Sequence, residues 1–268
     1  MIANVGPKRQ RTALITGASG GIGEELAGIF AARRFDLVLV ARDAARLRAV
    51  GEALTGRYGV RYTALPADLS VNGAVAELVG ELEHRGLVID VLVNNAGFAT
   101  YGQFKDLDLG DEMRMIQVNI AALAELTRRL LPGMVERRWG RILNVASTAA
   151  FMPGPLMAVY YASKAFVLSF SEAIGEELRG TGVTATALCP GPTRTGFQSR
   201  AGMEESKLVR GRTIMDAATV AREGYAGLMR GQAVVIPGLK NRLQILAPKF
   251  LPRRLIPGIV RSAQERVH

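Results

Sequence analysis

The chain has 268 residues, 49% of them hydrophobic, which is enough apolar material for one large core. Its net charge of +10 is uneven, because residues 237–268 carry seven Lys and Arg against one acid, a net +6. A nucleic-acid-binding protein would distribute its basic residues differently and would add aromatic residues for stacking, so we expect no nucleic acid partner.

Other chemistries are also excluded by composition. The chain has one cysteine, Cys189, and two histidines, His84 and His268, so neither an internal disulfide nor a cluster of metal ligands is expected. No apolar run approaches the roughly 18 residues that a membrane-spanning helix needs. The short polar segment 1–10 is a poor signal peptide. We therefore expect a cytoplasmic protein without a metal.

Apolar runs with strand character alternate with longer segments of helical spacing. The predicted strands are Thr12–Thr16, Leu37–Ala41, Arg61–Leu65, Asp90–Val93, Arg141–Ala146, Thr184–Leu188 and Ala233–Ile236. The predicted helices follow the first glycine loop to about Arg34 and then cover Ala44–Tyr58, Val71–Arg85, Leu109–Arg137, Val159–Leu178 and Asp216–Met229. This alternation predicts an α/β fold, a single doubly wound parallel sheet with helices on both faces.

A glycine-rich turn directly follows the first predicted strand and reads Gly17-Ala18-Ser19-Gly20-Gly21-Ile22-Gly23. Strand, glycine loop and helix in this order bring a pyrophosphate against backbone N–H groups at the positive end of a helix. Glycines are needed because a Cβ would block the close approach. An ordinary glycine-rich turn is the alternative, but the place of the loop in the alternating pattern favours dinucleotide binding.

The end of the second predicted strand bears on the choice of cofactor. Enzymes that prefer NAD carry an acid there for the ribose hydroxyls, whereas an arginine accommodates the additional phosphate of NADP. Here Ala41 stands at the acid's position and Arg42 follows. The sequence therefore predicts NADP(H), with NAD(H) as the alternative, although Arg42 can also be a solvated residue at a helix start. Asp43 is a candidate N-cap for the next helix.

A serine, a tyrosine and a lysine form the candidate catalytic group. Ser147 follows a predicted buried strand, and Tyr160 and Lys164 lie four residues apart on one helical face. An ammonium beside a phenol favours the phenolate and lowers the tyrosine pKa from about 10, while a serine hydroxyl can hold a carbonyl oxygen. An exposed helix with a solvated lysine is the alternative. Tyr161 is adjacent, but only Tyr160 has a lysine four residues on.

Taken together, these motifs resemble the short-chain dehydrogenase/reductase family over roughly residues 12–236. The matching motifs are Thr16-Gly17-x-x-x-Gly21-x-Gly23, Asp68-Leu69, Asn94-Asn95-Ala96-Gly97, Asn119, Ser147, Tyr160-x-x-x-Lys164 and Pro190-Gly191. The resemblance implies a Rossmann-like fold and, with Arg42, an NADP-preferring type. One departure is Ser19-Gly20, where many NADP-preferring relatives carry a basic residue, which leaves Arg42 as the main reader of the phosphate.

The resemblance also implies the role of each residue. Tyr160 would be the general acid in carbonyl reduction and the base in alcohol oxidation, Lys164 would lower its pKa and bind the nicotinamide ribose, and Ser147 would polarise the substrate carbonyl. Asn119 would hold a water that links Lys164 to solvent, unless its amide is satisfied locally. The cofactor-binding residues would be Gly17, Ser19, Gly20, Gly21, Ile22, Gly23, Arg42, Asp68, Leu69, Asn95, Ala96, Gly97, Tyr160, Lys164, Pro190, Gly191, Thr193 and Thr195.

Three of the positions carry a more detailed expectation. Asp68 would contact the adenine amino group, with a turn-forming aspartate as the alternative. Asn94 would help to shape the end of the fourth strand beside the adenosine ribose. Cys189 is expected to be a small buried residue rather than a reactive thiol, because no basic partner lies beside it in the sequence.

The substrate end is predicted to be roomy and apolar. Residues 197–212, within a substrate loop over 192–212, lack firm periodicity and are a candidate lid. The apolar candidates for the pocket are Phe98, Phe151, Met152, Met157, Phe197, Met203 and Leu208. A lipophilic ketone, acyl or steroid-like substrate is therefore favoured over a small polar sugar, although apolar loop residues can also pack on the fold.

The last 30 residues, 239–268, extend beyond the 1–238 core as part of the same domain. Pro248, Pro252 and Pro257 break this basic, amphipathic tail into short helical pieces. The tail can lie over the substrate entrance, on the anionic inner face of a membrane, or against a neighbouring subunit or its own domain.

The predicted function is hydride transfer between NADP(H) and a small-molecule carbonyl or secondary alcohol. A catalytically silent NADP-binding sensor or scaffold on the same fold is the alternative. The helices over Leu109–Arg137 and Val159–Leu178 resemble the family's dimer-forming pair. A homodimer or homotetramer is therefore expected.

Overall fold

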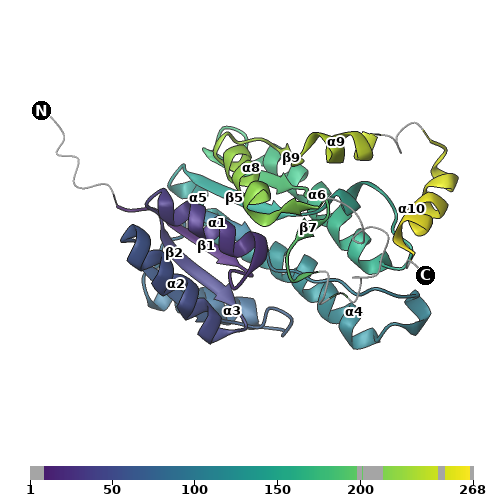
Figure 1. Ribbon diagram of the computed structural model, residues 1–268. Coiled ribbons are helices and arrows are strands. Elements are labelled where there is room, and N and C mark those ends of the chain that lie inside the picture. Colours follow the sequence, from purple (N-terminus) through teal and green to yellow (C-terminus); the bar gives the residue numbers. More distant parts are fainter. Residues whose placement is uncertain (1–8, 198–200, 202–213, 247–250, 266–268) are drawn as a thin grey trace, which may run out of the picture.

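A seven-stranded parallel sheet forms the centre of the molecule (Figure 1). The structure, a computed structural model, describes residues 9–197, 201, 214–246 and 251–265. The strands are β1 (Thr12–Thr16), β2 (Asp36–Ala41), β3 (Tyr62–Pro66), β4 (Val91–Asn94), β5 (Gly140–Val145), β6 (Val183–Leu188) and β9 (Val234–Val235). Their order, β3-β2-β1-β4-β5-β6-β9, reverses direction at β1, and every pairing is parallel. This is the doubly wound, Rossmann-like sheet that the alternating pattern predicted.

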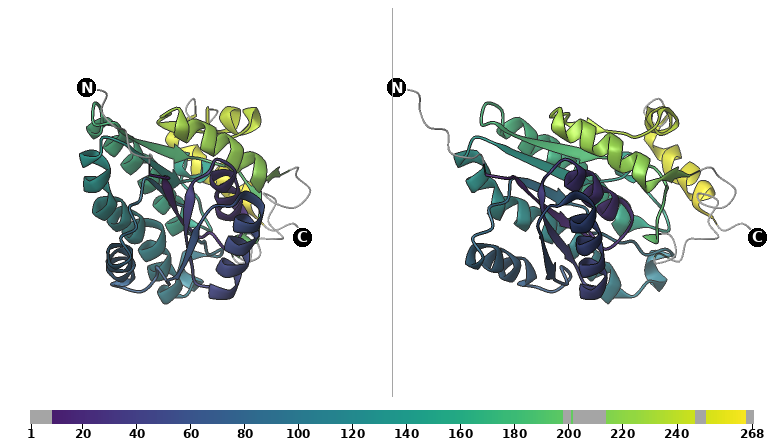
Figure 2. Two further views of the ribbon diagram at one scale, coloured as in Figure 1. Left: turned by 90° about the vertical axis from the view of Figure 1, so that its left-hand side faces the viewer. Right: turned by 60° about the vertical axis from the view of Figure 1, so that its left-hand side comes forward.

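Helices cover both faces of the sheet, as Figure 2 shows from two further sides. The helices are α1 (Gly21–Ala32), α2 (Ala44–Tyr58), α3 (Ala74–His84), α4 (Leu109–Ile116), α5 (Leu123–Glu136), α6 (Ala158–Glu177), α8 (Ala217–Met229), α9 (Leu239–Leu246) and α10 (Ile256–Gln264). Residues of β1 divide between two cores: Ile15 packs in the cluster with Phe30 of α1, and Leu14 packs in the cluster with Leu126 of α5. Successive side chains of a strand point to opposite faces of the sheet, so neighbouring residues of β1 contribute to the two hydrophobic layers.

The helix predicted over Leu109–Arg137 is not continuous. It consists of α4, a π-helical turn over Gln117–Ala122, and α5. Asn119 lies in the π-turn and is 1% exposed. A π-turn adds a residue to the helical turn and changes the direction in which side chains point, and such turns are frequent at functional sites. Hydrophobic spacing alone does not show this interruption.

Two further features differ from the prediction. The last strand, predicted over Ala233–Ile236, is reduced to β9, which pairs with the end of β6. A second small sheet joins β7 (Thr193–Arg194) to β8 (Met215–Asp216). This sheet brings the chain back after the loop that contains the predicted lid, although residues 198–200 and 202–213 of that loop lie outside the described part of the chain.

The basic tail is helical and interrupted, as its prolines predicted. α9 is followed, after the undescribed residues 247–250, by a 3-10 turn over Arg253–Leu255 and by α10. Pro257 lies in the first turn of α10, where a missing N–H breaks no hydrogen bond. No helix in the described ranges is long and apolar enough to cross a membrane.

Candidate active site

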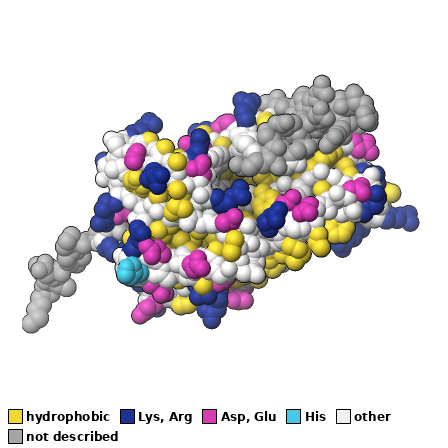
Figure 3. Space-filling model, turned by 90° about the horizontal axis from the view of Figure 1, so that it is seen from below, with side chains coloured by type: hydrophobic (Ala, Val, Ile, Leu, Met, Phe, Trp, Pro, Cys, Tyr) yellow, Lys and Arg dark blue, Asp and Glu magenta, His cyan; other side chains and the backbone are white. Residues whose placement is uncertain are grey.

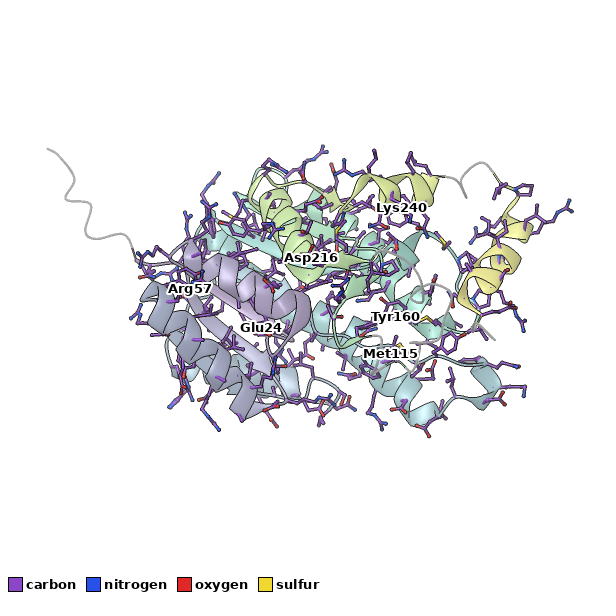
Figure 4. The ribbon with its side chains drawn as sticks, in the orientation of Figure 1. Glu24, Arg57, Met115, Tyr160, Asp216 and Lys240 are labelled. Atoms are coloured by element: carbon purple, nitrogen blue, oxygen red, sulfur yellow. The ribbon has the colours of Figure 1, made fainter. Side chains whose placement is uncertain are left out.

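A cavity of about 920 Å³ opens at the carboxyl ends of the strands, beside the point where the strand order reverses. Figure 4 shows Tyr160 there, below the label of Asp216 and away from Arg57 at the far end of the molecule. The predicted residues that line this cavity are Gly17, Ser19, Gly20, Gly21, Ile22, Arg42, Asp68, Leu69, Asn95, Ala96, Gly97, Ser147, Tyr160, Lys164, Pro190, Gly191, Thr193 and Thr195. Gly23 and Asn119 are not in this lining.

Close packing of the glycine loop explains its glycines. A Cβ on Gly23 would lie 2.3 Å from the Gly17 carbonyl oxygen and 2.5 Å from Asn95 Nδ2. Gly17 and Gly21 have φ values of +66° and +59°, in the left-handed region that favours glycine. Asn95 fixes the loop, because its Nδ2 donates to the carbonyls of Thr16 (2.9 Å) and Gly17 (3.2 Å). The loop is thereby held open for a phosphate at the start of α1.

The structure corrects the expectation for Asn94. Its side chain is 3% exposed and points away from the cavity, into the α5 and α6 layer. There its Nδ2 donates to Thr127 Oγ1 (3.0 Å) and to Asn144 Oδ1 (2.9 Å), and Asn144 in turn donates to Ser171 Oγ (2.9 Å). Asn94 therefore links β4, β5 and two helices and does not face a ribose. Asn95, the first residue after β4, lines the cavity, whereas Asn94 does not.

Tyr160, Lys164 and Ser147 meet at one wall of the cavity, the first two from α6 and the third from the end of β5. Lys164 is 5% exposed, its Nζ lies 5.8 Å from the centre of the Tyr160 ring, and it donates a 2.8 Å hydrogen bond to the Val145 carbonyl. The Ser147 hydroxyl accepts a 3.1 Å bond from the Ala149 N–H.

The direction of the tyrosine pKa differs from the sequence expectation. Desolvation raises the pKa of Tyr160 to about 12, and a hydrogen bond with Ser147 only partly opposes it. Desolvation also lowers the pKa of Lys164, to about 8. The expected lowering of the phenol pKa by Lys164 is therefore wrong for the protein as described. Its ammonium is bound to a backbone carbonyl, and burial weakens the charged form of both groups.

Asn119 lies behind Gly97, next to Lys164. Its Oδ1 accepts from the Phe98 N–H (3.2 Å), and its Nδ2 donates to the Phe98 carbonyl (3.0 Å) and to Ser163 Oγ (3.1 Å). A Cβ on Gly97 would lie 3.0 Å from Asn119 Oδ1 and 3.5 Å from Lys164 Nζ. A glycine at this position therefore leaves the gap between the amide and the ammonium open. The local bonds of Asn119 match the structural alternative, and its role with a water stays a prediction.

The adenosine end contains a residue that sequence reasoning missed. Arg46 of α2 lines the cavity, its Nε donates to the Ser19 carbonyl (2.7 Å), and its guanidinium lies 3.5 Å from Glu24. It lies in the first turn of α2, four residues after Arg42, which precedes the N-cap Asp43 and is outside the helix. A second arginine at the start of the predicted helix is the signal that could have found it. The structure thus brings a second guanidinium to the loop in which Ser19-Gly20 lacks a basic residue.

Two aspartates at this end have local partners. Asp43 caps α2, as predicted, by accepting from the Arg46 N–H (2.9 Å). Asp68 accepts from the N–H (3.0 Å) and hydroxyl (2.7 Å) of Ser70, which is the predicted turn, and it also lines the cavity. The turn-forming role of Asp68 and its predicted contact with the adenine amino group are therefore compatible.

The opposite end of the cavity is largely apolar. Phe98, Met152, Met157 and Phe197 line it, together with Tyr161. Phe151 does not, because its ring packs in the cluster of Leu123 and Val167 behind the wall. Met203 and Leu208, two other predicted pocket residues, lie outside the described residues.

The described part of the C-terminal tail packs beside this end against its own domain, which is one of the predicted placements. Gln244 of α9 lines the cavity. On α10, Gln264 is fully buried, its Nε2 donates to the Tyr161 hydroxyl (2.6 Å), and its carbonyl accepts from the Tyr101 hydroxyl (2.6 Å). Val260 packs in the same cluster as Tyr161. The tail is therefore part of the site's wall.

Cys189 is fully buried, and desolvation raises the pKa of its thiol to about 12. It is thus a small apolar core residue, as expected, because a thiol that stays protonated is a poor nucleophile. Within the described ranges, no group of three or more His, Cys, Asp or Glu side chains gathers as a candidate metal site.

The fold and the cavity define a doubly wound α/β protein with a nucleotide-sized site at its switch point. A family model described as short chain dehydrogenase matches residues 11–206, so the chain belongs to the short-chain dehydrogenase family. A solved short-chain dehydrogenase from Sphingobium yanoikuyae in complex with NADPH is 36% identical, with a TM-score of 0.81 over 95% of this chain and 98% of that one.

Two other similar proteins have more specific names. The bulky-bulky ketone specific alcohol dehydrogenase from Comamonas testosteroni is 29% identical, with a TM-score of 0.76 over 90% of this chain and 99% of that one. The very-long-chain 3-oxoacyl-CoA reductase of Rattus norvegicus is 34% identical over 193 residues, which are 70% of this chain and 61% of the relative. The chain thus spans less than two thirds of the length of that relative.

Proposed function

We propose that this protein is an NADP(H)-dependent oxidoreductase that transfers a hydride between the cofactor and a carbonyl or secondary alcohol of a lipophilic substrate. The observation that carries the proposal is that Ser147, Tyr160 and Lys164 line the same cavity as the glycine loop. A catalytically silent NADP-binding sensor would need the glycine loop but not the serine, tyrosine and lysine. The alternative of a cofactor-binding scaffold is therefore the weaker one.

The residues present fit a nicotinamide dinucleotide. The glycine loop leaves a cradle that a Cβ on Gly23 would fill, and the cavity continues from there to Tyr160. Gly17–Gly23 would hold the pyrophosphate, Arg42 and Arg46 the ribose phosphate, and Lys164 the nicotinamide ribose. When bound, this group supplies the hydride.

The chain's own residues supply orientation and the proton. Ser147 donates a hydrogen bond to the substrate carbonyl oxygen, which increases the partial positive charge on its carbon. Tyr160 donates its phenolic proton to that oxygen during reduction, and its raised pKa keeps the proton on the phenol at neutral pH. Lys164 stabilises the phenolate that remains, and Asn119 orients the water that returns a proton through Lys164.

The lining of the substrate end supports a lipophilic substrate. Phe98, Met152, Met157 and Phe197 offer apolar surface next to Tyr160, and a polar sugar would leave its hydroxyls there without partners. Two similar proteins, a very-long-chain 3-oxoacyl-CoA reductase and a bulky-bulky ketone specific alcohol dehydrogenase, support the same substrate class by their names. We assign the protein to 3-oxoacyl thioesters or bulky ketones.

A spectrophotometric assay of NADPH oxidation tests this function. The purified protein is expected to oxidise NADPH with a long-chain 3-oxoacyl thioester or a bulky aryl ketone, and at least about tenfold more slowly with a short, polar keto sugar, since each unburied methylene forgoes about 0.8 kcal/mol. Turnover of the sugar alone would contradict the lipophilic assignment. NADPH binding without turnover of any carbonyl in the panel would support the sensor instead.

Cofactor selectivity gives a second prediction. Arg42→Ala and Arg46→Ala are each expected to raise the KM for NADPH by about 10- to 100-fold and to change the KM for NADH only slightly, because a hydrogen bond to a charged group contributes about 1.5–3 kcal/mol. Steady-state kinetics with both cofactors measure this. Arg48→Ala is the matched control, since Arg48 is exposed on the same helix and does not line the cavity. An equal KM change for both cofactors would contradict the assignment.

We place the protein in the cytoplasm as a homodimer or homotetramer, with the tail at the inner face of a membrane. The exposed side chains of Leu109 and Met113, one turn apart on α4, and of Phe166 on α6 support a subunit contact through these helices. Apolar residues exposed at this spacing form a stripe that a second helix pair can cover.

A further inference from the structure

The outer face of α9 is a stripe of exposed leucines. Leu239, Leu243 and Leu246 have the spacing i, i+4, i+7 that places side chains on one helical face, and they are 71%, 59% and 44% exposed. Large apolar side chains are common on surfaces singly, but a run along one face marks a contact surface.

The inner face of α9 fixes the direction of this stripe. Ile245 is 5% exposed, and Asn241 donates a 2.7 Å hydrogen bond to the Pro237 carbonyl. Asn241 also lies directly against Gly191, because a Cβ there would be 2.4 Å from its Oδ1. The polar and buried side of α9 is thus held against the segment that contains Gly191, and the leucines point outward as a consequence.

The second piece of the tail also exposes apolar side chains. Leu251 before the 3-10 turn, Leu255 at the end of that turn and Ile259 of α10 are 41%, 50% and 53% exposed, whereas Val260 and Gln264 of α10 are buried against the body. α9 and α10 lie at the same end of the molecule in both Figure 1 and Figure 2. One end of the protein therefore carries two outward apolar faces.

Basic side chains accompany both faces. Within the described part of the tail, Lys240, Arg253, Arg254 and Arg261 are exposed, while Arg242 is turned toward Glu223, with an N–O distance of 4.0 Å. Figure 4 shows Lys240 on α9, far from Arg57 on α2. On the face seen in Figure 3, by contrast, basic and acidic side chains are interspersed. Residues 237–268 thus carry +6 of the net charge of +10.

We propose that the outward faces of α9 and α10 dock on an anionic lipid bilayer, with the leucines and Ile259 in the interface and the basic side chains on the lipid headgroups. The charge decides between this occupant and a second copy of the chain. A two-fold contact sets the same patch against itself, so it would place basic side chains opposite basic side chains. Apolar residues flanked by Lys and Arg are the composition that interfacial helices use on anionic membranes.

The docked face would adjoin the substrate end of the cavity. Gln244 of α9 lines the cavity, and Ile256 and Val260 of α10 pack in the cluster of Tyr160 and Tyr161. The same two helices thus face the bilayer on one side and the site on the other. A lipophilic substrate dissolved in the membrane would reach the cavity without crossing water; this part rests on the proposed function.

Vesicle sedimentation with the full chain tests the docking without any assay of activity. The wild type is expected to sediment with vesicles of phosphatidylcholine containing about 30% phosphatidylserine and to bind pure phosphatidylcholine at least about tenfold more weakly. The double variant Arg253→Glu/Arg254→Glu and the triple variant Leu239→Gln/Leu243→Gln/Leu246→Gln are each expected to lower binding about tenfold or more. Arg48→Glu/Arg57→Glu is the control, because it makes the same change of net charge on α2 and is expected to leave binding unchanged.

Each outcome has one meaning. Equal sedimentation of the wild type and the tail variants, or an equal loss in the α2 control, would overturn the docking face. A leucine variant that keeps vesicle binding but elutes as a smaller oligomer would overturn it in favour of a subunit contact. Circular dichroism of each variant is the control for an intact fold. A wild type that binds vesicles but oxidises no NADPH would support the docking and count against the proposed function alone.

Discussion

Tyr160→Phe is expected to lower kcat for carbonyl reduction by about 10²- to 10⁴-fold, the range that a positioned general acid contributes. The ring would still fill its place beside Phe197 and Tyr161, whose ring centres lie 5.5 Å and 6.0 Å away. Only the proton and the hydrogen bond with Ser147 are lost. NADPH affinity is expected to stay within a few-fold of wild type, as measured by fluorescence titration, so the effect should be on kcat rather than on cofactor binding.

Tyr161→Phe is the matched control, one residue along the same helix. Its hydroxyl accepts from Gln264 on α10, so the substitution removes a buried bond of the tail and is expected to lower stability by about 1 kcal/mol. Most of the activity should remain. The reverse result, a silent Tyr161→Phe and an active Tyr160→Phe, would move the proton donor to the neighbouring tyrosine and contradict the site as drawn.

The fold could be predicted from the periodicity of the hydrophobic residues and from the order of strands and helices along the chain. Strand runs such as Thr12–Thr16 are short, apolar and followed at once by turn residues, and longer helical segments separate them, so a parallel sheet was the only arrangement consistent with the connections. The same logic placed Gly17, Ser147 and Pro190 at one edge, because the carboxyl ends of parallel strands share it. Those residues do line one cavity.

The sequence could not show in which direction a side chain points, even where it placed the residue correctly along the chain. Asn94 and Asn95 are adjacent and chemically identical, yet one ties two helices to the sheet and the other fixes the glycine loop. Phe151 and Met152 likewise separate to the core and the cavity. Arg46 reaches the site only because α2 carries it there. A residue's face follows from local backbone geometry, and the spacing of motifs does not record it.

The pKa of Tyr160 shows a second limit of prediction from sequence. A lysine four residues away suggests a lowered value, because opposite charges favour the ionised phenol. Burial acts against both charges and dominates here, so the structure gives the other sign. The sequence shows that Tyr160 and Lys164 are neighbours, but the desolvation that shifts their pKa values depends on all the residues that pack around them.

Lys164→Met is expected to make the protein without cofactor more stable while it removes most of the activity. Desolvation lowers the pKa of Lys164 from 10.5 to about 8 in the folded state. At pH 7 the folded chain therefore carries an ammonium that the unfolded chain would solvate better, a difference of about 3 kcal/mol at most. Loss of the 2.8 Å bond to the Val145 carbonyl offsets about 1 kcal/mol. Urea unfolding at pH 7 should show a net gain of about 1–2 kcal/mol.

The pH dependence of this gain identifies its origin. Below about pH 8 the lysine is protonated in both states, and the difference between Lys164→Met and the wild type is constant. Between about pH 8 and 10.5 the folded wild type releases its proton before the unfolded chain does, so its stability rises with pH relative to the variant, and the difference shrinks. A difference that does not change with pH would mean that the ammonium is not desolvated. Such a result would support the proposal that the fold retains Lys164 for chemistry rather than for stability, since a methionine would fill a similar volume at lower free energy.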